Sequence, residues 1–217
     1  MGKEESLKTD LICSIIEYVR TNHAPAIDKA YDYFWDGNTP DEIMGGTALS
    51  LGFLNFEDWL VFDYNANEDK ETFIDIYMKN HSLKDKETAL LNSIRDSVIS
   101  LYEVSSVARD KRIILKDLLL ESEHTLRDKS LTRGLNKGDI FATRLLTLDG
   151  KTCMSGCVYP YTAEQKKIVL TYVGKQFKRY IKNVKPEGTM RDFLKDYGDV
   201  LNIIWMNLIM NPPKKNG

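Results

Sequence analysis

The sequence contains few cysteines and no long apolar run. Its three cysteines, Cys13, Cys153 and Cys157, are an odd and sparse set. Small secreted domains carry many paired cysteines, so this composition excludes a disulfide scaffold and favours a reducing cytoplasm. The apolar stretch Ile203–Met210 includes Asn207 and is far shorter than the roughly 20 residues that cross a bilayer. The first residues lack the apolar segment of a secretory signal, so we expect a cytoplasmic protein with no membrane partner.

The chain also lacks an excess of either charge. Thirty Lys and Arg residues are balanced by 32 Asp and Glu residues, which gives a formal net charge of −2. Any binding driven by charge must therefore come from a local patch. With 42% hydrophobic and 29% charged residues, the composition is that of an ordinary globular protein. A chain of 217 residues is long enough for one sizeable core or two small ones.

Helical and strand patterns occupy different parts of the chain. Up to about residue 100, apolar residues recur at the spacing of amphipathic helices. Short segments rich in β-branched residues follow, and they predict strands at 101–107, 111–116, 123–127, 139–148 and 151–159. Asp149-Gly150 fits the turn of a two-residue hairpin, because both of its central residues need positive φ. Such short strands favour a small, strongly bent sheet or a partial barrel.

Two further helices are predicted after this sheet. Thr162–Gln165 has the pattern of a capping box and begins a helix that runs to about Asn183. The second helix is expected at 189–210, with Tyr197 and Trp205 in its apolar stripe. We therefore predict an α+β fold, with a helical region at 1–100, a five-stranded antiparallel sheet or partial barrel at 101–160, and a C-terminal helical pair at 161–217.

No motif in the sequence indicates a cofactor, a metal or a catalytic residue. Cys153 and Cys157 form a single C-x3-C pair on one face of a predicted strand, where small core residues are the better interpretation than zinc ligands. The chain has neither a G-x-S-x-G elbow nor a phosphate-binding G-x-G-x-x-G loop. Arg133-Gly134 and Lys137-Gly138 could hold an anion, but glycines there more simply turn the chain before the strand at 139.

The helix at 162–185 is the most informative surface. Seven cations stand there against one acid, Glu164, and all but Lys166 fall within an arc of about 120°. The six on that arc are Lys167, Lys175, Lys178, Arg179, Lys182 and Lys185. This stripe is either a solvated face, balanced by acids such as Asp192, Asp196 and Asp199, or a contact for phosphate backbones, an acidic protein or an anionic membrane.

Several segments match, in order, a pattern of bacterial proteins. They are Trp59–Tyr64, Leu101–Val104, Leu115–Leu119, Ser130–Asp139 and Ser155-Gly156. Through them the region from 53 to 156 resembles uncharacterised bacterial proteins that carry a SEC-C motif, a small zinc-binding tail. The resemblance implies a bacterial cytoplasmic protein and implies no reaction. The cysteine-rich tail itself is absent from this sequence, so zinc binding is not carried over, and the sequence is consistent with a fragment of a longer protein.

Three hypotheses of function follow from these observations. The favoured one is a non-catalytic binding or adaptor module that contacts nucleic acid or an acidic protein through the helix at 162–185. The second is an enzyme with a pocket between the aromatic segment 53–64 and the β unit, using Asp58, Asp63 or Asp139 with Arg144. The third is a protein-interaction or oligomerisation scaffold whose last helix is the contact face. The sequence does not predict the oligomeric state.

Overall fold

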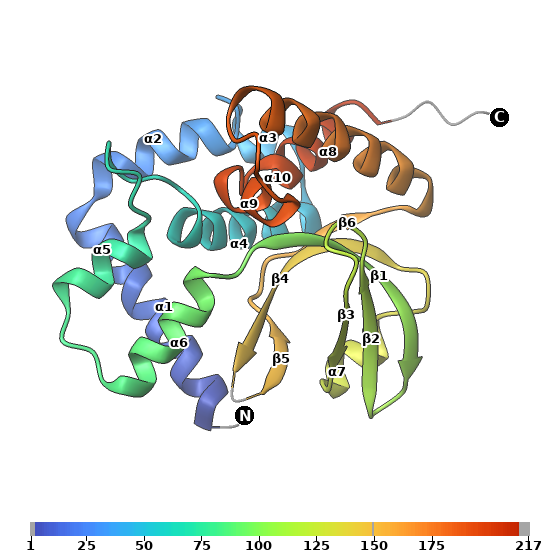
Figure 1. Ribbon diagram of the computed structural model, residues 1–217, viewed down its shortest axis with the longest axis horizontal. Coiled ribbons are helices and arrows are strands. Elements are labelled where there is room, and N and C mark those ends of the chain that lie inside the picture. Colours follow the sequence, from blue (N-terminus) through green and yellow to red (C-terminus); the bar gives the residue numbers. More distant parts are fainter. Residues whose placement is uncertain (1–2, 149, 213–217) are drawn as a thin grey trace.

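The N-terminal part of the protein is helical. The computed structural model describes residues 3–148 and 150–212, and in this part six helices precede the first strand (Figure 1). Their bounds are α1 Lys3–Asn22, α2 Ala24–Phe34, α3 Pro40–Ile43, α4 Gly46–Phe62, α5 Phe73–Asn80 and α6 Asp85–Arg95. Apolar faces with helical spacing are buried, as at Ile15 and Val19 of α1 and at Leu91 and Ile94 of α6. The helical region expected from the periodicity is confirmed.

Most of the aromatic segment 53–64 lies in α4, which runs from Gly46 to Phe62, and Asp63 follows the end of this helix. Gly52 explains how α4 can pack closely against the end of α2. A Cβ atom at Gly52 would lie only 2.6 Å from the ring of Trp35, so no larger residue fits without displacing the indole. The ring of Trp35 is fully buried by this contact.

Five strands form a closed, barrel-like ring, and a sixth short strand extends it. The strands are β1 Ile99–Ala108, β2 Arg112–Asp117, β3 Glu123–Leu126, β4 Ile140–Leu148, β5 Lys151–Met154 and β6 Tyr159–Tyr161. The order β1-β2-β3-β5-β4 is closed by pairing of β4 with β1, and β6 pairs with β4. The sheet is mixed rather than purely antiparallel, because β3 and β5 meet in parallel at Leu126 and Thr152.

The strand predicted at 151–159 is interrupted in the structure. After Met154 the chain leaves the ladder, passes Gly156 at a φ of +135°, and rejoins the same edge of β4 as β6. The hydroxyl of Thr143 donates a hydrogen bond of 2.6 Å to the carbonyl of Cys157 in this interruption. Cys153 and Cys157 therefore do not share one strand, which corrects the expected alternation. In the predicted hairpin turn, Asp149 lies outside the described residues, whereas Gly150 has the positive φ that the turn needs.

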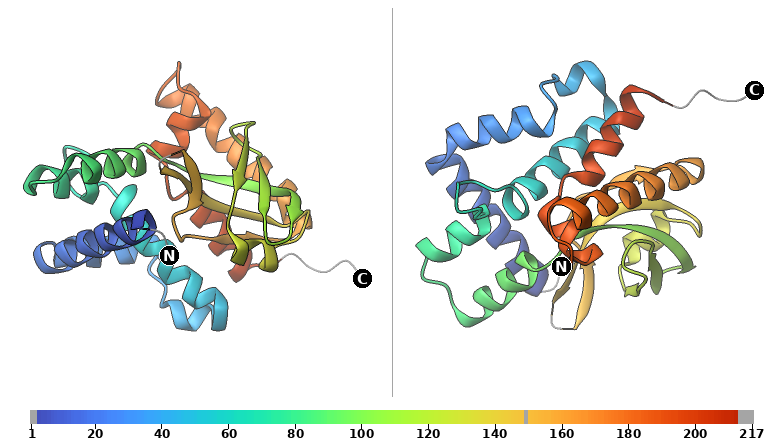
Figure 2. Two further views of the ribbon diagram at one scale, coloured as in Figure 1. Left: turned by 90° about the horizontal axis from the view of Figure 1, so that it is seen from below. Right: turned by 45° about the horizontal axis from the view of Figure 1, so that its top comes forward.

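Three helices follow the sheet, where two were predicted. They are α8 Ala163–Asn183, α9 Met190–Asp196 and α10 Val200–Met210. The predicted helix at 189–210 is broken at Gly198, where a Cβ atom would lie 2.5 Å from the Cβ of Asp63. The glycine required by this close contact with α4 separates α9 from α10. Figures 1 and 2 show α8, α9 and α10 gathered on one side of the barrel.

One apolar core joins the two helical regions. It includes Ile15 of α1, Trp59 of α4, Val173 of α8 and Trp205 of α10, together with the outer face of the sheet. A smaller cluster fills the inside of the ring, with the members Tyr102, Val104, Ile113, Leu115, Leu126 and Phe141. Consecutive residues of β1 face different clusters, as the two-residue period of a strand requires. The C-terminal helices are thus anchored to the rest of the protein.

A short helix, α7 Lys129–Gly134, was not predicted. It lies between β3 and β4, and the side chain of Asp128 caps it by accepting hydrogen bonds from the backbone N–H groups of Ser130 and Leu131. Gly134 ends this helix, and Gly138 has a φ of +92° just before β4. Gly138 thus turns the chain before this strand, as predicted. Arg133, the other candidate for holding an anion, forms an ion pair of 2.7 Å with Asp110.

Candidate ligand-binding surface on the C-terminal helices

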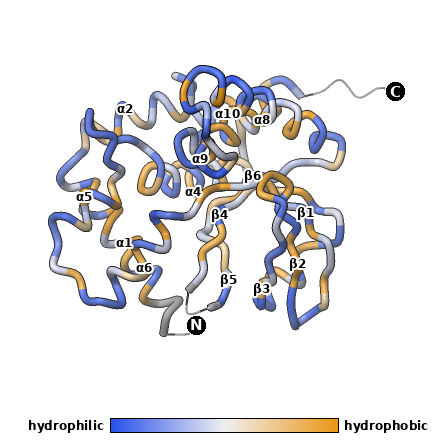
Figure 3. Tube along the Cα trace, viewed as in Figure 1, coloured by the Kyte–Doolittle hydropathy of each residue, from blue (hydrophilic) through white to orange (hydrophobic). Residues whose placement is uncertain are grey.

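The helix α8 is fixed at its start and along one face. The hydroxyl of Thr162 accepts a hydrogen bond from the N–H of Gln165, and the Gln165 side chain accepts one from the N–H of Thr162 at 2.8 Å. This is the predicted capping box. Val169, Val173 and Tyr180 are buried against the core. Hydrophilic and hydrophobic residues alternate along α8 in Figure 3. Its cations Lys167, Lys175, Lys178, Arg179 and Lys182 are exposed, so the cationic side faces outward.

Four cations of the predicted stripe gather around one open hollow. Lys175, Lys178, Arg179 and Lys182 line it, together with Leu170, Thr171 and Gly174, and it encloses about 530 Å³. All four cationic residues are exposed. We call this feature the cationic hollow. Lys167 is also exposed but lies outside the lining of the hollow, one to two turns nearer the start of α8.

The cations of α8 differ in whether an acid neutralises them. Lys185 forms an ion pair of 2.6 Å with Asp192, and Lys166 forms one of 2.7 Å with Glu103. Among the described residues, the side chain of Arg179 is hydrogen-bonded only to the neutral side-chain oxygen of Gln176, at 3.3 Å. Within residues 3–148 and 150–212, no ion pair involves Lys167, Lys175, Lys178 or Lys182. Asp192 therefore neutralises Lys185, as the solvated-face interpretation expected. The four cations that line the cationic hollow keep their positive charge.

Gly174 lies at the floor of the cationic hollow, and packing does not explain it. A Cβ atom at this position would meet no heavy atom within 4 Å. A glycine inside a helix costs about 1 kcal/mol relative to alanine because it loses more backbone freedom on folding. This cost is not offset by any close approach within the protein. The glycine instead adds no side chain to the lining of the cationic hollow.

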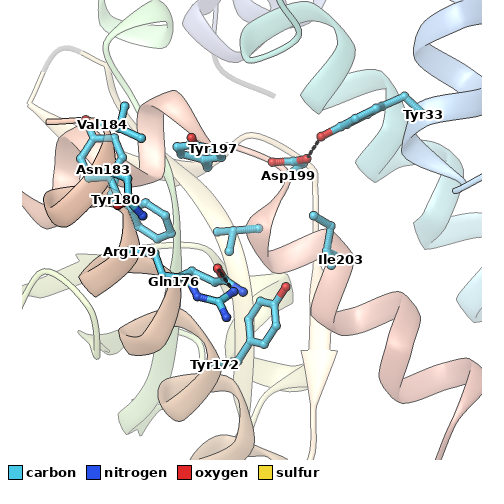
Figure 4. Close-up of a pocket in the computed structure, with 12 residues that line it drawn as sticks. Tyr33, Tyr172, Gln176, Arg179, Tyr180, Asn183, Val184, Tyr197, Asp199 and Ile203 are labelled. Atoms are coloured by element: carbon cyan, nitrogen blue, oxygen red, sulfur yellow. Dashed lines mark hydrogen bonds between the residues drawn. The ribbon is translucent and has the colours of Figure 1, made fainter.

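A second hollow adjoins the first and is mainly aromatic and apolar (Figure 4). It encloses about 360 Å³ between α8, the α9–α10 connection and Tyr33 of α2. Its lining is Tyr33, Tyr172, Gln176, Arg179, Tyr180, Asn183, Val184, Phe193, Tyr197, Asp199, Val200 and Ile203. We call it the aromatic hollow. Four of these side chains are large, apolar or aromatic, and unusually exposed, namely Tyr33 at 61%, Val184 at 57%, Tyr197 at 42% and Ile203 at 39%.

Tyr33 and Asp199 form the polar corner of the aromatic hollow. The Tyr33 hydroxyl donates a hydrogen bond of 2.6 Å to Oδ2 of Asp199, as the dashed line in Figure 4 marks. Burial raises the pKa of the Asp199 carboxyl above its ordinary value, and the hydrogen bond from Tyr33 opposes that rise. Burial and the bond to Asp199 also raise the pKa of the Tyr33 phenol. The phenol stays protonated as a donor, and the carboxylate keeps further acceptor positions.

Arg179 lines both hollows. The two hollows are therefore parts of one continuous surface, with lysines on one side of Arg179 and aromatic rings on the other. A surface of this composition offers point charges and hydrogen-bond donors for anions, and flat faces for stacking. Only the cationic part of this surface was predicted from the sequence.

Three of the four residues of the enzyme hypothesis, Asp58, Asp63 and Arg144, meet in the protein interior. The guanidinium of Arg144, on β4, is fully buried, and its Nε donates to Asp58 at 2.8 Å. Its Nη2 bonds to Asp63, and its Nη1 donates to the carbonyl of Ser97 at 3.0 Å. Lys195 of α9 adds an ion pair of 3.3 Å with Asp63. Arg144 thus contacts both acids, although it lies more than 80 residues after them, and the contact is in the interior rather than in the pocket that the enzyme hypothesis expected.

This buried cluster joins structural elements. Burial alone would lower the pKa of Arg144, but the charges of Asp58 and Asp63 raise it far above its ordinary value, so the arginine stays charged. The charges of two cations, Arg144 and Lys195, balance those of two carboxylates, Asp58 and Asp63. The contacts among them connect α4, β4, α9 and the turn before β1. None of these four side chains lines either hollow. Asp139, the remaining candidate, accepts a hydrogen bond of 2.7 Å from the N–H of Asn136 in the turn before β4.

The cysteines show no arrangement for metal chemistry. Cys157 is buried, and burial raises the pKa of its thiol above the ordinary range, which disfavours the thiolate. In the part of the chain that the structure describes, no group of three or more His, Cys, Asp or Glu residues could hold a metal ion.

The aromatic hollow was missed in the sequence because its residues come from three separate segments. Tyr33 does carry a local signal, since it falls outside the helix face shared by Ile27, Tyr31 and Phe34, and an aromatic residue off the apolar face faces solvent. Tyr197 carries the opposite signal. It fits the apolar stripe of a continuous helix, and only the break at Gly198 turns it outward.

Comparison with known proteins gives a family. The model of a family described as "Family of unknown function (DUF7986)" matches residues 50–196, which is more than half of the chain. The match includes all of α8 but neither Tyr33 nor Asp199. No curated protein matches the chain, and no solved structure does. Across the described residues, none of the helices has both the length and the apolar character needed to span a bilayer.

Proposed function

The chain belongs to the DUF7986 family of unknown function, and we propose that it is a non-catalytic module that binds nucleic acid through α8. The observation that supports this most is the cationic hollow, where Lys175, Lys178, Arg179 and Lys182 stand together without acids to neutralise them. Phosphate contacts by Lys and Arg release counterions and supply most of the sequence-independent affinity for nucleic acids.

Two features favour a phosphate backbone over an acidic protein. The cations follow one helix face, so they form a line of charge that suits a chain of phosphates. Gly174 adds no side chain to the lining of the cationic hollow, which leaves room for a close approach of phosphates. An acidic protein partner remains the second candidate for the same surface. A cytoplasmic location and the bacterial origin that the SEC-C resemblance implies are parts of this proposal.

The enzyme hypothesis has less support. Arg144 has no exposed surface, and its nitrogens already bond to Asp58, Asp63 and Ser97. A catalytic group must reach a substrate, and these side chains are held in contacts that stabilise the fold. The scaffold hypothesis concerned the last helix, but Ile204, Trp205 and Met206 of α10 are buried in this protein's own core.

Charge reversal on α8 tests the proposal. Fluorescence anisotropy measures binding of labelled single- and double-stranded DNA and RNA to the wild-type protein and to Lys175→Glu/Lys178→Glu/Lys182→Glu. We expect the affinity to fall at least about tenfold at low salt, because three phosphate contacts become repulsive. The matched control is Lys86→Glu/Lys111→Glu/Lys129→Glu, which makes the same change in net charge at exposed lysines on α6, the β1–β2 turn and α7.

The control distinguishes a local surface from overall charge. It should bind nearly as well as the wild-type protein, and both triple variants should unfold at nearly the wild-type temperature. Equal losses in both variants would show that binding is diffuse. Absence of binding by the wild-type protein even at low salt would refute the proposal and shift attention to acidic protein partners.

A further inference from the structure

We propose that the aromatic hollow receives an unpaired guanine of a single strand whose phosphates lie along the cationic hollow. This inference rests on the proposed function and adds to it the form of the nucleic acid and the preferred base. It is argued from the aromatic hollow and its carboxylate, Asp199. The argument for nucleic-acid binding by α8 does not depend on either of them.

The aromatic hollow has rings that are held in place and yet exposed. The ring of Tyr33 stacks on Trp59 at 5.8 Å between centroids and an interplanar angle of 11°, while 61% of the residue stays exposed. Tyr197 is supported by Phe193 at 5.6 Å and by Tyr180 at 5.8 Å. A base that stacks on such a supported ring gains affinity at little entropic cost, because the ring has little freedom left to lose.

Arg179 fixes how a strand would cross this surface. Because Arg179 lines both hollows, a nucleotide with its base in the aromatic hollow has its phosphate beside Arg179. The next phosphates then continue toward Lys175, Lys178 and Lys182. A double helix keeps its bases stacked inside, so only an unpaired strand can place a base against Tyr197 and phosphates on α8 at once.

Asp199 provides the base preference. It is only 7% exposed, it lines the aromatic hollow, and Oδ2 already accepts the hydrogen bond from Tyr33. An ionised carboxylate accepts hydrogen bonds and donates none, so it favours a base edge with N–H donors. Guanine presents N1–H and the N2 amino group side by side on its Watson–Crick edge. Adenine and cytosine present one amino group there, beside an acceptor.

The experiment measures the binding of oligothymidines of about 10 nucleotides, within the range of single-strand sites. One has a central guanine, one a central adenine, and one no substitution. We expect the wild-type protein to bind the guanine strand about tenfold more tightly than the others, because paired hydrogen bonds to one base edge discriminate against bases that cannot form both. Guanosine monophosphate should bind at least about tenfold more weakly than the guanine strand, because it does not reach the lysines.

Two substitutions test separately the base preference provided by Asp199 and the stacking provided by Tyr197. Asp199→Asn should bring the ratio of guanine to adenine affinity close to one. Tyr197→Ala should weaken the binding of every strand by at least about fivefold through lost stacking. Leu54→Ala is the control, since Leu54 is an apolar residue that is 49% exposed on α4, outside both hollows. Thermal unfolding of each variant confirms that it is folded.

The outcomes separate this inference from the proposed function. If all strands bind equally, and if Tyr197→Ala and Asp199→Asn change nothing while the lysine reversals abolish binding, the guanine site is refuted and the proposed function stands. If guanosine monophosphate binds as tightly as the strand, a mononucleotide site replaces the strand site. If no strand binds the wild-type protein, the guanine site is refuted, and the proposed function fails as well only if double-stranded DNA and RNA do not bind.

Discussion

Arg144 and Lys178 are both cations, yet their surroundings are opposite. Arg144 is fully buried between Asp58 and Asp63, and all three of its nitrogens make hydrogen bonds. Lys178 is exposed on α8, and no ion pair in the described part of the chain involves it. The protein thus contains one cluster whose charges are satisfied internally and one whose charges are not. The first stabilises the fold, and the second is available to a ligand.

The largest effect in this comparison should come from Arg144→Met. Removing one partner of a buried ion pair leaves unpaired charges behind, here Asp58 and Asp63, and typically costs about 3–5 kcal/mol. This is a large fraction of the roughly 5–15 kcal/mol that stabilises a typical domain. Urea unfolding followed by circular dichroism measures the loss. A loss below about 1 kcal/mol would show that the cluster is not what joins α4, β4 and α9.

Gly174→Ala tests the other region in this comparison, the cationic hollow. Because no atom lies near the added Cβ, the substitution should raise the stability by about 0.5–1 kcal/mol. In contrast, Gly174→Leu should place a bulky group in the cationic hollow and weaken strand binding. Chemical unfolding measures the first effect and anisotropy the second. A destabilising Gly174→Ala would mean that the fold, rather than the ligand, requires glycine at this position.

Asp199→Asn should make stability less dependent on pH. The native pKa of Asp199 lies above its ordinary value of 3.8 because the carboxyl is buried. Its ionisation therefore opposes folding, fully at neutral pH and not at all once the pH is below the ordinary pKa. The variant should be slightly more stable than the wild-type protein at pH 7, and this gain should disappear as the pH falls to about 4. Thermal unfolding at several pH values tests this sign, and a gain that grows on acidification would contradict it.

The smallest effect should come from Arg20→Met. Arg20 forms an ion pair of 2.7 Å with Glu57 on α4, but its side chain is 66% exposed. An exposed pair contributes about 0–1 kcal/mol, because water screens the attraction and both side chains lose freedom. The change in the urea midpoint should be close to the detection limit. A loss as large as that of Arg144→Met would show that burial does not explain the difference between the two arginines.

The sequence predicted the features that depend on local pattern. Short stretches of sequence determine each of these features. They are the capping box at Thr162, the apolar face of α8, and the change from helix to strand near residue 100. The break at Gly198 was missed because its cause is Asp63, which lies 135 residues earlier and approaches too closely for a Cβ atom. The parallel pairing of β3 with β5 was missed because it also depends on distant residues. It forms only when the whole sheet closes into a ring.

The candidate surface divides in the same way. The cationic stripe could be predicted because all of its residues lie within 19 positions, from Lys167 to Lys185, on one helix. The aromatic hollow could not, because Tyr33, Tyr172 and Asp199 come from segments whose approach depends on packing. The pairing of Lys185 with Asp192 likewise depends on how α9 folds back after α8, and it removes one cation from the predicted stripe.

The most direct test of the proposed surface is the salt dependence of strand binding, compared between the wild-type protein and Lys178→Gln. Each phosphate contact on a single strand contributes about −0.7 to the slope of the logarithm of the binding constant against that of the salt concentration. Four contacts in the cationic hollow predict a wild-type slope near −3, and the variant should be shallower by about 0.7. An unchanged slope in Lys178→Gln, or no binding at low salt, would contradict the assignment of α8 as the contact surface.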